Sequence, residues 1–191
     1  MSEKPPMAER ILNAANRLFY QKGIRAIGVD AIAAEAGISK RSLYDTFPSK
    51  EALIAAYLQR RMLPIPPSED PPLQKVLSMF DQLHGRFASG NFRGCPFVNA
   101  VAEMAGESGA VDDIARKFKE GRREMITTWL AQAGARNPHA LGVHVSLLIE
   151  GAYSVMLLHG DPGIALQAQE AARVLMRADG LNPPAAANEA A

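Results

Sequence analysis

The fold of this chain is decided by residues 29–47, which read VDAIAAEAGISKRSLYDTF. Small and apolar side chains fall on one face of a short helix at the start of this stretch: Val29, Ile32, Ala33 and Ala36. Gly37 follows, where a left-handed backbone ends a helix at least cost. Ser39 then offers an N-cap for a second helix. The pattern predicts two helices joined by a sharp turn, which is the layout of a helix-turn-helix.

The second helix of this pair has an inward and an outward face. Its inward residues are Ile38, Leu43 and Phe47. We expect six polar or basic residues on and after it to contact DNA: Lys40, Arg41, Ser42, Tyr44, Thr46 and Lys50. An arginine can form a bidentate pair with guanine, and hydroxyl and ammonium groups suit phosphate. The alternative is a three-helix packing unit with an ordinary solvated basic face.

Helical periodicity recurs along the rest of the chain, whereas no stretch alternates convincingly at the two-residue period of a strand. The first helix is expected to end before Gly23, and Ser49 is expected to cap a fourth. Further helices are expected near 72–88, from Pro96 to about 105, and near 111–134, 138–159 and 162–178. We therefore predict an all-α protein, with an N-terminal three-helix helix-turn-helix domain and a C-terminal helical ligand-binding and dimerisation domain.

Five prolines among residues 64–72 mark the clearest boundary, because proline interrupts a helix. We place the DNA-binding domain at 1–62, the ligand-binding and dimerisation domain at 63–181, and a disordered tail at 182–191. The net charge of +1 hides an asymmetry between these parts. Residues 1–62 carry +4 and the remainder −3, which hints at a polyanionic partner for the first part only.

Residues 37–53, GISKRSLYDTFPSKEAL, strongly resemble the DNA-binding domain of the tetracycline-repressor (TetR) family. The preceding string from Phe19 to Gly23 and the run from Val29 to Ala33 share the resemblance, which spans about 50 residues. It implies a homodimeric, all-helical repressor with a divergent C-terminal ligand domain. Two positions depart from the family: Thr46, where the family often has His, and Gly28, where it often has Thr or Ser.

The C-terminal helices are unusually apolar. In residues 140–158 the only charged residue is Glu150, so this helix must be covered on two sides. We expect it to form the homodimer interface together with the helix near 162–178, the alternative being that both are only monomer core. A small apolar effector is expected to contact seven residues: Phe80, His84, Phe87, Met104, Met125, Trp129 and Tyr153. His84, Glu150 and His159 are the polar groups expected nearest a cavity.

Cys95 is the only cysteine and precedes Pro96, which suits the first position of a helix. A thiol at a helix N-terminus can be activated, so a redox- or electrophile-responsive repressor is the alternative function. A buried structural cysteine is the plainer interpretation. The string Arg93 to Phe97 resembles one in a subgroup of TetR-like regulators.

The sequence gives little support to an enzyme. It contains no Gly-rich phosphate loop, no Gly-x-Ser-x-Gly and no HExxH, and its four histidines are scattered. We predict no catalytic residues, no metal site and no cofactor. The expected function is a sequence-specific transcriptional regulator, a repressor released from a palindromic operator by its effector. With no membrane-length apolar run and no secretory signal, a cytoplasmic protein without membrane contact is expected.

Overall fold

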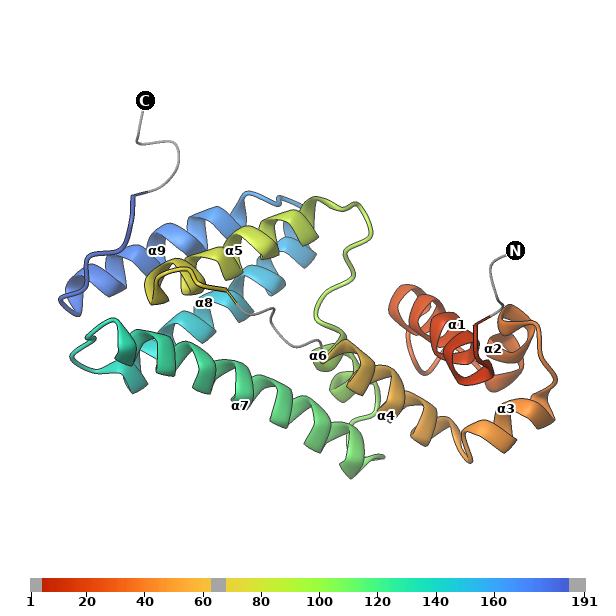
Figure 1. The fold of residues 1–191 in the computed structure, drawn as a ribbon. Helices are drawn as coiled ribbons and strands as arrows, with labels where there is room; N and C mark the ends of the chain where they lie inside the picture. The colour runs from red at the N-terminus through yellow and green to blue at the C-terminus, as the bar shows by residue number, and fades with distance from the viewer. Residues whose placement is uncertain (1–4, 63–67, 186–191) are drawn as a thin grey trace. The chain divides into compact units, whose positions relative to one another are not determined.

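The computed structural model describes residues 5–62 and 68–185, and all regular structure in those ranges is helical. The helices are α1 (Met7–Lys22), α2 (Val29–Ala36), α3 (Lys40–Thr46), α4 (Lys50–Arg61), α5 (Pro72–Ala88), α6 (Pro96–Glu103), α7 (Gly109–Gln132), α8 (Pro138–His159) and α9 (Ile164–Ala178) (Figure 1). The predicted all-α fold with an N-terminal helix-turn-helix is therefore confirmed. The chain forms two compact units: Met1–Pro64 with Cys95–Phe118, and Ile65–Gly94 with Lys119–Ala191.

In the first unit, α1 packs against α2, α3 and α4. Ile11, Ala14 and Ala15 of α1 are fully buried, and so are Leu43 of α3 and Leu53 of α4. Alanines at the α1 contacts allow the neighbouring helices to approach closely, while the larger side chains fill the remaining space. This packing fixes the position of α3, the second helix of the predicted helix-turn-helix.

The turn between α2 and α3 is built as its sequence predicts. Gly37 has φ of +63°, the left-handed conformation that glycine adopts most easily. The Ser39 Oγ accepts a hydrogen bond of 3.0 Å from the amide of Ser42, which caps α3. Arg10 of α1 adds a support from outside the motif, since it donates to the carbonyls of Ala36 and Gly37 at 2.6 and 2.9 Å. The turn is therefore stabilised both by the Ser39 cap and by the Arg10 side chain.

The first unit also contains α6 and the beginning of α7, which lie far along the chain from the helix-turn-helix. Cys95 is the N-cap residue of α6 and Pro96 occupies its first turn, as the sequence predicts. The rings of Phe97 and Phe118 stack with centroids 3.9 Å apart. This stacking joins α6 to α7 within the unit.

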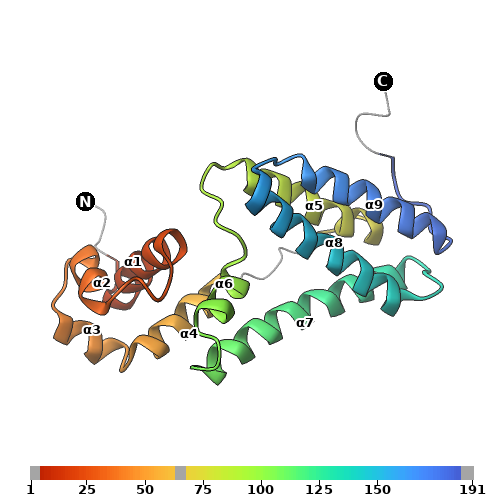
Figure 2. The same ribbon diagram turned by 180° about the vertical axis from the view of Figure 1, so that it is seen from behind.

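The second unit is a layer of helices in which α9 packs on both α5 and α8. The two opposite views of the ribbon show these three helices side by side (Figure 2). Buried alanines line the α9 side of this packing: Ala165, Ala168 and Ala172. Larger buried side chains such as Phe80 of α5 and Ile149 of α8 face them. The small side chains of α9 allow it to pack closely on α5 and α8.

Helix α8 also approaches α7 closely at one point. A Cβ added at Gly142 would lie 2.3 Å from Thr127 Oγ1 and 3.4 Å from the Thr127 Cα. Among the described residues, α8 is the helix long and apolar enough to cross a membrane. About a third of its apolar window is buried in the structure, where the helix packs on α9.

The segment after α9 is packed for a short distance. Leu181 and Pro183 are buried, and Arg173 Nε donates to the Pro184 carbonyl at 3.0 Å. The disordered tail expected at 182–191 therefore includes four described residues, of which Pro183 is buried against the unit. The rest of that prediction, at 186–191, lies outside the described residues, as do residues 63–67 of the proline-rich boundary.

Candidate functional site

Helix α3 presents basic and hydroxyl side chains to solvent. Lys40, Arg41 and Tyr44 are exposed, and Tyr44 keeps 41% of its accessible surface although it is a large aromatic residue. Leu43, on the opposite face, is fully buried. The buried leucine fixes the rotation of the helix, so the exposed residues point away from the unit. A short helix that turns arginine, lysine and tyrosine outward has the composition of a DNA-contacting surface.

Three of the predicted DNA contacts on α3 already have partners within the unit. The Lys40 ammonium lies 3.0 Å from Asp30 of α2, and the hydrogen bond to that carboxylate raises the pKa of Lys40. Ser42 Oγ lies 2.9 Å from Ser39 Oγ, and Thr46 Oγ1 donates to the Ser42 carbonyl at 2.9 Å. These contacts hold the side chains in place on α3, which reduces the conformational entropy that binding must remove.

Lys50 lies apart from the α3 surface. Its Nζ donates to the carbonyl of Ile24 at 2.7 Å, and the side chain is half-buried. Burial lowers the pKa of Lys50, and the nearby Glu103 carboxylate partly opposes that shift. The sequence predicts an ammonium directed to phosphate, whereas the structure directs it to the loop between α1 and α2. Its partner is 26 residues away in sequence, which local spacing does not reveal.

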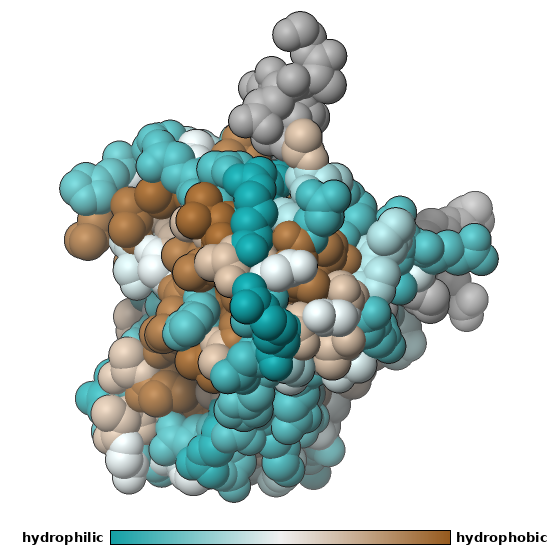
Figure 3. Space-filling model, turned by 90° about the vertical axis from the view of Figure 1, so that its left-hand side faces the viewer, coloured by the Kyte–Doolittle hydropathy of each residue, from teal (hydrophilic) through white to brown (hydrophobic). Residues whose placement is uncertain are grey.

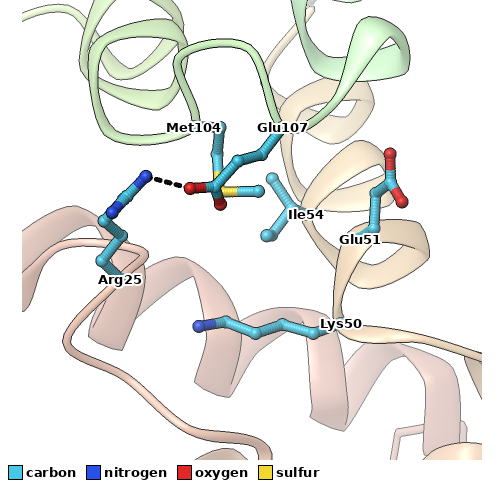
Figure 4. A pocket seen from close by; sticks show the side chains of 6 residues that line it. All are labelled: Arg25, Lys50, Glu51, Ile54, Met104 and Glu107. Carbon is cyan, nitrogen blue, oxygen red and sulfur yellow. Dashed lines mark hydrogen bonds and ion pairs between the residues drawn. The ribbon is translucent and has the colours of Figure 1, made fainter.

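Lys50 lines a pocket of about 370 Å³ within the first unit. The other lining residues are Arg25, Glu51, Ile54, Met104 and Glu107. Figure 4 shows Arg25 reaching across to the Glu107 carboxylate, with Lys50 extending below them. The amide of Arg25 also donates to Glu103 Oε2 at 2.9 Å. This ion pair and this hydrogen bond connect the loop after α1 to the end of α6 and the segment that follows it.

A second connection in the same region joins Glu51 of α4 to Ser108, whose hydroxyl donates to the Glu51 carboxylate. The same Ser108 Oγ accepts from the Val111 amide at 3.3 Å, so Ser108 caps the start of α7. Sequence reasoning missed Glu103, Glu107 and Ser108. The one local signal is a serine three residues before Val111, which is a typical cap position.

The predicted effector residues separate into three groups. Phe80, Phe87 and Tyr153 are buried in the second unit, and His84, Met125 and Trp129 are half-buried there. Met104 belongs to the first unit and lines the pocket of Arg25 and Lys50. Phe87 and Tyr153 contact each other with ring centroids 5.6 Å apart, and Arg86 donates to the Tyr153 hydroxyl at 2.8 Å. The structure thus brings six of the seven into one unit.

Glu150, expected near a cavity, is the centre of an ion-pair network in the second unit. Lys119 Nζ lies 2.7 and 2.6 Å from its two carboxylate oxygens, and Arg122 also pairs with it. These three residues line a hollow between α7 and α8 together with Glu120, Arg123 and Ser146. Partly buried charged side chains are stabilised when they pair with and hydrogen-bond one another, as these three do.

Cys95 is 6% exposed at the start of α6. The residues before and after it in the sequence, Gly94 and Pro96, are also buried. Among the described residues, no three of the side chains that commonly bind metals are grouped to hold an ion. Polar side chains gather at α3, at the Arg25–Lys50 pocket and around Glu150, and a buried pair, Gln169 and Arg173, is hydrogen-bonded within α9.

Comparison with known proteins gives two family matches. Residues 11–57 match the family described as bacterial regulatory proteins, tetR family. Residues 72–172 match the C-terminal domain of transcriptional regulators that are LmrA/YxaF-like. The second match covers more than half of the chain.

Individual relatives agree with these matches. The chain is 51% identical over 53 residues to Rv1255c of Mycobacterium tuberculosis, an uncharacterized HTH-type transcriptional regulator. That alignment covers 28% of this chain and 26% of the relative, so it spans about a quarter of that protein. YxaF of Bacillus subtilis, another uncharacterized HTH-type regulator, is 27% identical over 199 residues, covering 94% of this chain and 100% of that protein.

Solved structures share the fold over both units. SCO4454, a TetR-family transcriptional regulator from Streptomyces coelicolor, is 29% identical with a TM-score of 0.79, and the alignment covers 91% of this chain and 96% of that one. The structure of SAV143 from Streptomyces avermitilis has a TM-score of 0.82 at 26% identity, covering 93% and 100% of the two chains. With a helix-turn-helix that matches one family domain and a C-terminal region that matches another, the chain belongs to the TetR family of DNA-binding transcriptional regulators.

Proposed function

We propose that this protein is a cytoplasmic repressor that binds a palindromic operator as a homodimer and leaves it when a small effector binds. The observation that carries the proposal is the α3 surface, where Lys40, Arg41 and Tyr44 are exposed opposite the buried Leu43. Arg41 is the residue that we expect to read a base, because arginine pairs with guanine through two parallel hydrogen bonds. Lys40 and Tyr44 would contact phosphate and set the register of α3 in the major groove.

The homodimer is supported by an exposed stripe on α8. Its members recur at alternating intervals of three and four residues: His144, Leu147, Gly151, Ser154 and Leu158. Leu147 and Leu158 are 62% and 78% exposed, which is unusual for leucines in a core helix. This spacing is that of a helix seam that packs on another helix, and glycine and serine at its centre permit close approach.

Helix α9 adds to the same unpartnered apolar surface. Leu166 and Val174 are 42% and 55% exposed, and α9 packs directly on α8. Figure 3 shows apolar side chains gathered into contiguous areas of the face that it presents. Two copies of α8 and α9 would bury these residues in a four-helix interface around a two-fold axis. A two-fold dimer in turn favours a palindromic operator, with half-sites about 34–36 Å apart or a multiple of that distance.

The proposal is tested with DNA from upstream of the protein's own gene. Affinity would be measured by fluorescence anisotropy beside an unrelated fragment of equal length, at two salt concentrations, and the bound region would be mapped by footprinting. We expect preferential, salt-sensitive binding and a footprint with two symmetric halves. Equal affinity for both fragments, together with no protected site in a genome-wide selection of bound fragments, would refute the proposed function.

A further inference from the structure

The proposed function does not say what kind of effector binds. A hollow between α7 and α8 in the second unit has a lining that indicates one chemical class. Its volume is about 330 Å³, at the small end of the range for sites that bind organic molecules. Helix α7 contributes Lys119, Glu120, Arg122 and Arg123, and α8 contributes Ser146 and Glu150. Three cations therefore line it against two carboxylates.

Two of these cations share one carboxylate. Lys119 Nζ contacts both oxygens of Glu150 at 2.7 and 2.6 Å, and Arg122 pairs with the same Oε1. The Arg122 and Lys119 side chains are only 13% and 25% exposed. A partly buried charge is stabilised most by a close, hydrogen-bonded counter-charge. The lining carries one cation more than carboxylates, so an anion suits this hollow better than a cation.

Aromatic side chains adjoin the positive end of this hollow. The Lys119 ammonium lies 5.8 Å from the centroid of the Tyr153 ring. That ring contacts Phe87 and Phe92, with centroids 5.6 and 5.8 Å away. Tyr153 and Phe87 are buried and do not line the hollow, so the apolar body of an acid would contact the aliphatic stems of Lys119, Arg122 and Arg123.

We propose that this hollow binds a small organic acid with an apolar body, whose carboxylate is held by Lys119 and Arg122. Glu150 is the internal competitor, since it occupies the same two cations when the acid is absent. Binding the acid would weaken the Lys119–Glu150 and Arg122–Glu150 pairs that join α7 to α8. Binding of an acid at this site is independent of the proposed function. Its role as the effector that releases DNA rests on the proposed function.

The first experiment measures binding without DNA. Trp129 of α7 is the only tryptophan of the chain and is half-buried seven residues after Arg122, so its fluorescence is a natural reporter. The probes are phenylbutyrate and its neutral amide, which share size and apolar body. We expect the acid to bind at least about tenfold more tightly, because hydrogen bonds to charged groups are the stronger ones.

Variants assign the preference to particular residues. Lys119→Gln combined with Arg122→Gln should abolish the advantage of the acid over the amide. Glu150→Gln removes the competitor and keeps both cations, so it should tighten acid binding by about tenfold. Lys117→Gln, an exposed lysine on the same helix, is the matched control for loss of one charge and should leave both affinities unchanged. Circular dichroism melts would show that each variant is folded.

Several results would overturn the site. They are equal affinity for acid and amide, no binding of the acid, an acid preference that survives the double substitution, or weaker acid binding by Glu150→Gln. The effector role is measured separately as release of the operator fragment. Acid that binds without releasing DNA would refute the effector role, while failure of the protein to bind any DNA would refute the proposed function and leave the fluorescence result standing.

Discussion

Replacing Gly142 by alanine should destabilise the second unit, against the usual trend for helices. In an exposed helix interior, alanine is more stable than glycine by about 1 kcal/mol. At Gly142 the new Cβ would lie 2.3 Å from Thr127 Oγ1 and 3.3 Å from the Thr127 Cβ. The hydroxyl overlap is more than about 1 Å inside normal contact, and a β-branched side chain has few alternative rotamers.

The overlap therefore has to be relieved by moving α7 relative to α8 or by an unfavourable Thr127 rotamer. Overpacking of this kind costs about 1–3 kcal/mol, which offsets the gain in helix propensity and leaves a net loss of up to roughly 2 kcal/mol. For a chain of this size that corresponds to a thermal unfolding midpoint lower by up to about 8 °C. Gly121→Ala on α7 is the matched control, because nothing lies within 4 Å of its added Cβ. Gly121→Ala should raise the thermal unfolding midpoint by about 2–4 °C.

The assay is thermal and urea unfolding followed by circular dichroism, with Thr127→Ser and the Gly142→Ala/Thr127→Ser pair completing a double-mutant cycle. Serine keeps the hydroxyl and rotates more freely, so the pair should recover part of the loss. If Gly142→Ala is as stable as Gly121→Ala, α7 and α8 are not in close contact at this point. The walls of the proposed acid site would then be wrong as well.

Three further predictions follow from single contacts. Burial raises the pKa of Tyr57 to about 12, so the folded state holds this proton more tightly and the stability it contributes is lost as the pH rises from about 10 to 12. In a spectrophotometric pH titration, Tyr57→Phe should remove a tyrosine step near pH 12, and retention of that step would refute the assignment. Ser39→Ala removes the cap of α3 and should cost about 1 kcal/mol in urea unfolding, whereas Ser42→Ala, which keeps the capping oxygen of Ser39, should cost less. Leu158→Glu should convert the proposed dimer to a monomer in analytical ultracentrifugation, while Val98→Glu, also at an exposed apolar residue, should leave the mass unchanged; a dimeric Leu158→Glu would place the interface elsewhere.

The helix-turn-helix was predictable because its signals are local. Gly37 and the two capping serines act on residues within four positions of themselves, so the sequence alone contains both partners of each contact. The exposed positions of α3 follow from the burial of Leu43 by simple helical spacing. The breaks before Pro72 and Pro138 follow from proline geometry in the same way.

The contacts of Lys50 and Arg25 could not be predicted, because their partners are distant in sequence. Lys50 meets the Ile24 carbonyl 26 positions away, and Arg25 meets Glu103 at a separation of 78. A lysine in the first turn of a helix is compatible with a phosphate contact or with an internal carbonyl, and only the tertiary structure distinguishes them.

The seven effector residues remain a prediction, since pockets and cores are lined by the same residue types and sequence alone does not separate them. Phe80 and Phe87 are 0% and 1% exposed and complete the core of the second unit. Met104 belongs to the other unit, which no periodicity could indicate. Glu150 was recognisable because a single charge on an apolar helix requires a partner, and the structure supplies Lys119 and Arg122.

The central claim is that α3 reads a DNA sequence through Arg41. The most direct measurement is the ratio of affinities for the operator fragment and an unrelated fragment, compared between the wild type, Arg41→Ala and Arg60→Ala. Arg60 is an exposed arginine of α4 in the same unit, so it controls for the loss of one positive charge. We predict that Arg41→Ala lowers the ratio by roughly 5- to 150-fold, equivalent to about 1–3 kcal/mol, and that Arg60→Ala leaves it unchanged. An unchanged ratio in Arg41→Ala would contradict the assignment of α3 as the helix that reads bases.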